Sequence, residues 1–255
     1  MDKGMDTRKV KDSLNRLLRY LPVRMPTTGW SFAHKAPACV VSPENRTWTC
    51  MFGYINRIVR GEPVCFSSEN TGCSGASCYL GFKTPSKDAG SFLAQKEKFK
   101  KDAALGNAFY EHIGAHASET KFIIWGTIDN SDEDAEIEVV NLWVDAVNLA
   151  GLVTLSNYDR PNNDNVSVPF ASGCQSIWTI PYKEKHAEES KGIVGCMDPA
   201  MRKYLPSDVV SFSVPTKRFV EMTENISGSF LEQSGWKNLM DEKVHSSGRA
   251  RRNPT

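Results

Sequence analysis

Glu138–Leu155, with the sequence EVVNLWVDAVNLAGLVTL, is the stretch that decides the fold class. Its first part, Glu138–Val144, has the β-branched and aromatic composition of a buried strand. Its second part, Ala146–Leu155, is a good helix that Asp145 can cap with its side chain. A strand, a capped turn and a helix in this order are typical of a mixed or parallel sheet.

Strands and helices alternate irregularly on both sides of this stretch. Phe122–Ile128 has the composition of another buried strand, and Val209–Val214 alternates valine or phenylalanine with serine. Residues 6–21 form one apolar stripe at helical spacing. We therefore predict one α+β domain over residues 1–240, a mixed sheet flanked by helices, followed by a disordered polar and basic tail over residues 241–255.

Two other segments are assigned from their local composition. Met25–Thr47 carries several prolines, which predicts an irregular segment. Ser91–Leu105 is read as one helix whose lysines lie on its polar faces. A lysine run without interleaved aromatic or arginine residues is typical of a solvated face, so we expect no nucleic-acid binding.

The composition is that of an ordinary globular protein. The 255 residues are 40% apolar and 24% charged, with a formal net charge of +1, which gives no long-range field for nucleic acid or an anionic membrane. No apolar run approaches the roughly 20 residues that span a bilayer. The N-terminus is charged where a signal peptide needs an apolar core. We therefore expect a cytoplasmic protein that does not bind membranes.

Cysteines give the sequence its most informative pattern. There are seven, an odd number, and in a reducing compartment they are packing groups, metal ligands or redox groups rather than structural disulfides. Two of them lie in Gly72–Phe82, GCSGASCYLGF, and its opening Gly-Cys pair recurs at Gly173–Cys174 and Gly195–Cys196. We predict that these three segments converge on one site.

The geometry of a helix limits how Gly72–Phe82 can contribute. Residues five apart on a helix diverge by about 140°, so Cys73 and Cys78 share a ligand only if Cys73 sits before the helix, at its N-cap. Gly72 and Gly75 permit unusual backbone angles and close approach of a ligand. A thiol at a helix N-terminus has its thiolate stabilised by the dipole and the free N–H groups.

Three functions remain open for such a site. In the first, the thiols hold an iron–sulfur cluster or a zinc ion, with a redox-related role; the four candidate ligands are Cys73, Cys78, Cys174 and Cys196. In the second, the Gly-Cys helix starts bind an anionic or planar small molecule. Its candidate contacts are Gly72, Cys73, Ser74, Gly75, Gly173, Cys174, Trp178 as an apolar wall, and Arg202 for an anion. In the third, the segments lie far apart, the cysteines are buried packing groups, and the protein is an interaction scaffold.

A weak internal similarity favours a shared site. Val64–Phe66 precedes Gly72–Cys73, and Val168–Phe170 precedes Gly173–Cys174, so each half reads as a strand, a loop, a Gly-Cys pair and a helix. If both units fold in this way, they supply two half-sites. No G-x-S-x-G elbow, HExxH motif or phosphate-binding loop is present, so the sequence gives no hydrolase or nucleotide signature.

Four segments together resemble the prokaryotic domain-of-unknown-function family 169. They are GCSGASCYLGF, GCQSIWTIPY, GIVGCMDPAMRKYLPSDVVSFSVPTKRFVEM and SGWKNLM. The likeness runs from the first predicted helix to Met240 and rests on the order of the motifs. It implies a prokaryotic cytoplasmic protein with no established activity, and it implies that the positions of Cys73 and Cys174 belong to the family pattern.

Overall fold

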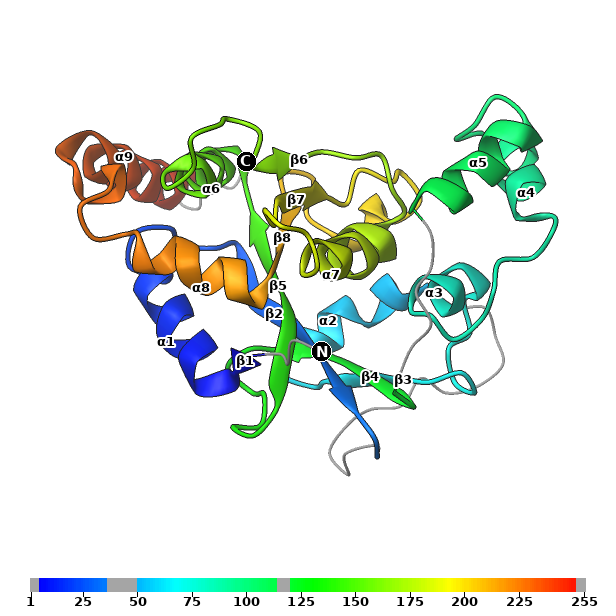
Figure 1. Cartoon of the computed structure of the whole chain (residues 1–255). Helices are drawn as coiled ribbons and strands as arrows, with labels where there is room; N and C mark the ends of the chain where they lie inside the picture. Colours follow the sequence, from blue (N-terminus) through cyan, green and yellow to red (C-terminus); the bar gives the residue numbers. More distant parts are fainter. Residues whose placement is uncertain (1–4, 36–49, 114–119, 251–255) are drawn as a thin grey trace.

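The structure is a computed structural model that describes residues 5–35, 50–113 and 120–250. Its centre is an eight-stranded sheet in the order β3-β4-β2-β5-β8-β7-β6, with the short β1 also paired to β5 (Figure 1). The strands are β1 Met5–Asp6, β2 Met25–Ala33, β3 Val64–Phe66, β4 Phe122–Thr127, β5 Glu136–Val144, β6 Val166–Ser167, β7 Gly192–Gly195 and β8 Val210–Pro215. The pair β6–β7 is parallel and the other pairs are antiparallel, so the sheet is mixed, as predicted.

Helices cover both faces of the sheet, which confirms the single α+β domain. On one face lie α1 (Thr7–Leu18), α6 (Ala146–Asn157) and α8 (Thr216–Glu224). On the other lie η1 (Met51–Tyr54), α2 (Ile55–Ile58), α3 (Ser74–Tyr79), the π-helix η2 (Gln175–Thr179) and α7 (Ile180–Glu184). The remaining helices are α4 (Ala89–Gln95), α5 (Ala103–Ile113), η3 (Arg202–Tyr204), η4 (Phe230–Glu232) and α9 (Ser234–Ala250). None of the helices in the described ranges has the length and apolarity to cross a membrane.

Strand β5 explains why the sheet is buried on both sides. Val140, Leu142 and Val144 belong to the core under α1, α6 and α8, whereas Val139 and Trp143 belong to the core under α2, α3 and η2. A strand covered on both faces needs apolar residues at nearly every position, because neither face meets water. The capped turn is also as predicted, since the Asp145 side chain accepts a hydrogen bond from the N–H of Asn148 at 3.1 Å and opens α6.

One buried polar residue interrupts β5 and ties η2 to the sheet. The side-chain carbonyl of Asn141 accepts a hydrogen bond from the Trp30 indole at 2.8 Å. Its amide donates to the backbone carbonyl of Ile177 at 2.8 Å and to the Ser213 hydroxyl at 2.9 Å. Since a buried amide must satisfy both of its ends, these three bonds fix η2 over the middle of the sheet.

The prediction of an irregular segment at Met25–Thr47 is wrong for its first part. Residues 25–33 form β2, which pairs with β4 on one side and β5 on the other, and residues 36–49 lie outside the described part. Pro26 sits near the start of the strand, where a missing N–H is tolerated. Gly29 leaves room for its neighbours, since a Cβ atom there would lie 2.4 Å from the Ile128 side chain and 3.1 Å from that of Ile137. Pairing between distant segments is not visible in the local composition.

The prediction of one helix over Ser91–Leu105 is also wrong. The chain forms α4 and then α5, and between them Lys98 takes a left-handed φ of 59° that ends the first helix. The two helices cross closely at Gly90 and Gly106, since a Cβ on Gly106 would lie 2.3 Å from the Gly90 carbonyl oxygen. We call this unit, residues 89–113, the α4–α5 hairpin.

The last helix runs across the boundary that the sequence suggested at residue 240. The α9 backbone continues to Ala250, and Lys243 on it donates to the Asp145 carboxylate at 2.8 Å and to the Asn148 side chain at 3.0 Å. Trp236 packs against α6 at Gly151, where a Cβ would lie 2.6 Å from the indole ring. Residues 251–255 of the predicted tail lie outside the described part.

Candidate functional site

The first two Gly-Cys segments start from opposite ends of the sheet and meet on one of its faces. Strand β3 is one end strand and leads to Cys73 and α3, whereas β6 is the other end strand and leads to Cys174 and η2. The two helices are tied together, since the Thr179 hydroxyl donates to the backbone carbonyl of Tyr79 at 2.8 Å. Cys174 lies in the core on this face, and Cys73 packs against the same core.

Cys73 is the N-cap of α3, as predicted. Its sulfur accepts a hydrogen bond from the N–H of Ala76 at 3.5 Å. Gly72 and Ser74 beside it are exposed. Gly75 is not forced by crowding, because a Cβ there would lie 3.6 Å from the Tyr79 ring and 3.8 Å from the Cys73 sulfur, both ordinary contacts.

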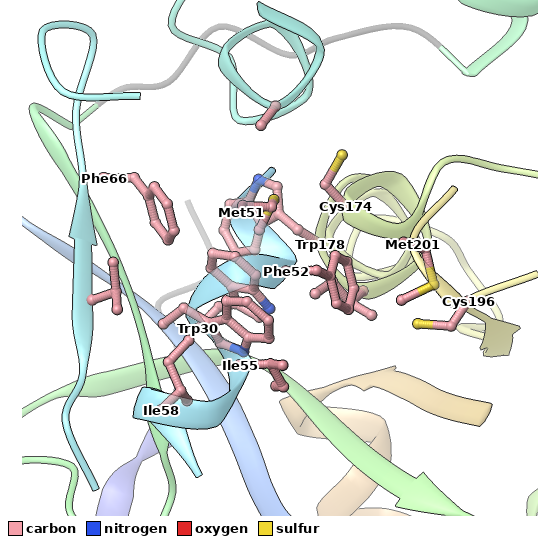
Figure 2. Close-up of a cluster of buried hydrophobic side chains, with 14 of the residues drawn as sticks. Trp30, Met51, Phe52, Ile55, Ile58, Phe66, Cys174, Trp178, Cys196 and Met201 are labelled. Atoms are coloured by element: carbon pink, nitrogen blue, oxygen red, sulfur yellow. The ribbon is translucent and has the colours of Figure 1, made fainter. Parts of the chain in front are cut away.

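Cys174 is held more tightly than Cys73. Gly173 packs directly on η1, where a Cβ would lie 2.6 Å from the Phe52 ring, so only glycine fits. The Cys174 side chain is buried and opens the π-helix η2. Figure 2 shows its sulfur directed away from the centre of the aromatic cluster, in a direction different from that of the Cys196 sulfur.

The thiolate stabilisation that we predicted at these helix starts is wrong. Burial raises the pKa of the Cys73 thiol above its ordinary value, and the N–H groups of Ala76 and Gly75 offset this only in part. Burial, followed by the charges of Cys73, Cys50 and Asp198, raises the pKa of Cys174 well above its ordinary value. The cost of desolvating each thiolate therefore outweighs the stabilisation that the start of a short helix gives it, and both groups are thiols at neutral pH.

Two further groups belong to the site, and sequence reasoning missed them. Cys50 lies just before η1, and burial together with the charges of Cys73 and Asp198 raises its pKa. Asp198 is a buried carboxylate that accepts a hydrogen bond from the N–H of Ala200 at 2.8 Å. Cys50, Cys73, Cys174 and Asp198 form what we call the thiol cluster. Only the Gly-Cys pairs carried a local signal, because Cys50 and Asp198 come from loops that the tertiary fold brings in.

The four-thiol centre that we predicted is not assembled. Among the described residues, no group of three or more His, Cys, Asp or Glu side chains has the arrangement of a metal site. Cys78 is buried within α3, where desolvation raises its pKa. Cys196 is fully buried with a left-handed φ of 64° rather than at a helix start, and its N–H donates to the Ser176 hydroxyl at 3.1 Å. Burial raises the pKa of Cys196 to about 12.

Two predicted ligand contacts are occupied by the protein itself. Trp178 is completely buried, with its ring 4.7 Å from that of Tyr182 and 5.3 Å from that of Trp30, so it packs in the core rather than facing a ligand. The Arg202 guanidinium donates to the backbone carbonyls of Pro206 and Ser207, at 2.9 Å each, and to that of Val209. These bonds close the loop after η3, so Arg202 is not poised for an anion.

Unsatisfied polar atoms lie on both cysteine-bearing helices. The Ser77 hydroxyl in α3 and the Gln175 amide nitrogen in η2 are buried and have no hydrogen-bond partner among the described residues. The other end of the Gln175 amide accepts from the N–H of Ser172 at 2.8 Å. A buried donor without a partner costs about 1–3 kcal/mol, so two of them in one region are a feature to be explained.

With this geometry in place, the comparisons with known proteins decide the family. The family model of domain-of-unknown-function family 169, described as "Uncharacterised ArCR", matches residues 19–225. The chain belongs to this family. No curated protein and no solved structure gives a significant match.

The family 169 match covers the whole thiol cluster. It begins directly after α1, includes every strand except β1, and ends just after α8. Helix α9 therefore lies outside the matched region, whereas Cys50, Cys73, Cys174 and Asp198 all lie within it.

Proposed function

We propose that the protein binds a thiophilic metal ion or metal–sulfur centre through Cys73 and Cys174. Because the described residues hold no preformed group of three or more donors, binding would have to draw these two thiols, and Cys50 and Asp198 beside them, closer together. The observation that supports this most is the meeting of two Gly-Cys segments from opposite ends of the sheet on one face. Thiolates are the ligands that zinc, copper(I) and iron–sulfur clusters prefer. The reduced thiols that this needs agree with the cytoplasmic location expected from the sequence.

The electrostatics of the thiol cluster favour a positively charged ligand. Each of its groups becomes negative when it loses a proton, and Cys73, Cys50 and Asp198 each raise the pKa of a neighbouring thiol. Glu97 from the α4–α5 hairpin adds a further negative charge, which raises the pKa of Cys73. A bound cation removes this mutual repulsion and displaces the thiol protons, whereas an anionic ligand would increase the repulsion. The anionic ligand considered from the sequence is therefore disfavoured.

Metal analysis of anaerobically purified protein tests the proposal. We expect the wild-type protein to hold, or to take up from added Cd²⁺, about one metal ion per chain, and the Cys73→Ser and Cys174→Ser variants to lose it. Cys65→Ser is the matched control, because Cys65 is fully buried in β3 and is not among the charges that act on Cys73 or Cys174. Metal-free wild-type protein that takes up no Cd²⁺, or equal loss in all three variants, would contradict the proposal.

A second candidate is a small polar molecule that hydrogen-bonds to the Ser77 hydroxyl and the Gln175 amide nitrogen, two of the buried side-chain atoms without a partner among the described residues. Such a ligand would satisfy both groups by hydrogen bonding and would need no thiolate. Native mass spectrometry of protein isolated from cells separates the two functions. A bound mass that persists in Cys73→Ser/Cys174→Ser but is lost in Ser77→Ala/Gln175→Met supports the polar molecule, and the reverse pattern supports the metal.

A further inference from the structure

We propose that the α4–α5 hairpin is a cover that bridges the two Gly-Cys segments and controls access to Cys73 and Cys174. The proposal rests on the proposed function for what the site binds, but it concerns access to the thiols and is tested without metal. Figure 1 shows the hairpin projecting from the body of the molecule, far from the sheet.

The hairpin contacts the body at the segments that carry the two cysteines. Tyr110 on α5 stacks on Tyr79 of α3, with ring centroids 5.8 Å apart and planes 15° from parallel. Phe99 and Phe109 contact Phe170, four residues before Cys174, at centroid distances of 5.6 and 6.0 Å. The hairpin therefore spans from the helix that follows Cys73 to the residues that precede Cys174.

The hairpin also interacts electrostatically with the thiol cluster. Glu97 follows α4, and its carboxylate is close enough to Cys73 and Asp198 to be electrostatically coupled to both. Residues of the hairpin therefore form part of the surroundings of the thiols and are not a separate module.

The contacts that seat the hairpin are few. Only Leu93, Phe109 and Ala171 form its buried cluster in the described part of the chain, whereas each of the two main cores has many more buried residues. Lys100 adds a cation–π contact, with its ammonium 4.9 Å from the centre of the Phe109 ring and 5.7 Å from that of Phe170. A unit held by a small cluster opens at a lower free energy than the core does, so it can release without global unfolding.

Thiol alkylation of the reduced, metal-free protein tests this inference. Iodoacetamide is added under native conditions, and the rate at each cysteine is followed by peptide mass spectrometry. We expect Phe109→Ala to increase the rates at Cys73 and Cys174 by about tenfold, because it removes the main seating contact. Its matched control is Phe92→Ala on the same hairpin, since Phe92 is 52% exposed, and its rates should equal those of the wild type.

A second pair of variants protects the test against misfolding. Lys100→Ala removes only the cation–π contact and should increase both rates by about twofold or more, whereas Lys101→Ala, at an exposed neighbouring position, should leave them unchanged. Cys65 and Cys196, which are fully buried in the body, report global unfolding. If Phe109→Ala raises the alkylation rates of Cys65 and Cys196 as much as those of Cys73 and Cys174, the variant has unfolded, and the rates in Lys100→Ala then decide the test. Rates at Cys73 and Cys174 that stay at the wild-type value in Lys100→Ala, and in a folded Phe109→Ala, would overturn the cover. Failure to bind metal would leave this result unaffected.

Discussion

At position 141 the sequence places an asparagine in a strand between Val140 and Leu142, where both faces of the sheet are buried. Replacing it by leucine would leave the Trp30 indole, the Ile177 carbonyl and the Ser213 hydroxyl without their partner. We expect Asn141→Leu to lower the free energy of unfolding by about 3 kcal/mol or more, because several buried groups lose their hydrogen bonds together.

Denaturant unfolding of Asn141→Leu measures this loss, and Asn130→Leu is the control. Asn130 is exposed and bonds only to the Gly61 carbonyl at 3.3 Å among the described contacts, so its loss should cost less than about 1 kcal/mol. Equal stability of the two variants would show that the Asn141 network does not hold η2 on the sheet.

Glu97 gives a second prediction for a single residue, which concerns the pKa of Cys73. Burial comes first among the causes that raise the pKa of Cys73, and the Glu97 carboxylate adds to it. Glu97→Gln removes that charge with little change in shape, so the pKa of Cys73 should fall. At a fixed neutral pH the alkylation rate of Cys73 should rise by about twofold or more, because the thiolate is the reacting form. Glu111→Gln, at an exposed position on α5, should not change it.

At the scale of elements, one buried ion pair joins α8 to the end of α6. The Arg218 guanidinium is almost fully buried and donates to both carboxylate oxygens of Asp159, at 2.6 and 2.8 Å. The hydrogen bonds from Arg218 lower the pKa of Asp159 below its ordinary value despite partial burial. Because the folded pKa lies below the unfolded one, this carboxylate stabilises the fold fully above the unfolded pKa of about 3.9, and the contribution is lost as the pH falls through the folded value.

Asp159→Asn should therefore be less stable than the wild type at neutral pH, by about 1.5–3 kcal/mol. The difference should stay constant down to about pH 5 and shrink on further acidification. Thermal or denaturant unfolding across this range measures it. The exposed pair of Asp164 and Lys191 gives the control, since Asp164→Asn should change stability by no more than about 0.5 kcal/mol. A difference that grows at acid pH would contradict the sign of the Asp159 shift.

Helix α9 gives the other prediction at this scale. A chain that ends at Met240 loses Lys243 and its bonds to Asp145 and Asn148, whereas a chain that ends at Ala250 keeps them. We expect the shorter chain to unfold at a denaturant concentration lower by the equivalent of about 1–3 kcal/mol, because charged hydrogen bonds at the start of α6 are lost. The longer chain should match the full-length protein. Equal stability of all three would place the end of the folded domain at residue 240, as the sequence suggested.

At the scale of the whole molecule, the sequence predicts what local patterns encode. The predictions of strands at Val64–Phe66 and Phe122–Ile128, of the Asp145 cap and of the N-cap position of Cys73 all follow from neighbouring residues. The structure confirms them, with the second strand ending one residue earlier, at Thr127. Strand β2 was missed because its pairing partners lie about a hundred residues away. Cys50 and Asp198 were missed for the same reason, and the dipole argument for Cys73 was wrong because burial is a property of the whole fold.

The most direct test of the account is the structure of the protein crystallised with Cd²⁺, in which anomalous scattering locates the metal. If Cys73 and Cys174 act together, both sulfur atoms ligate one metal ion and lie roughly 4 Å from each other, as tetrahedral geometry with metal–sulfur bonds of about 2.3 Å requires. A metal ion bound by only one of these cysteines, or bound elsewhere while the two sulfur atoms stay apart, would contradict the proposed site.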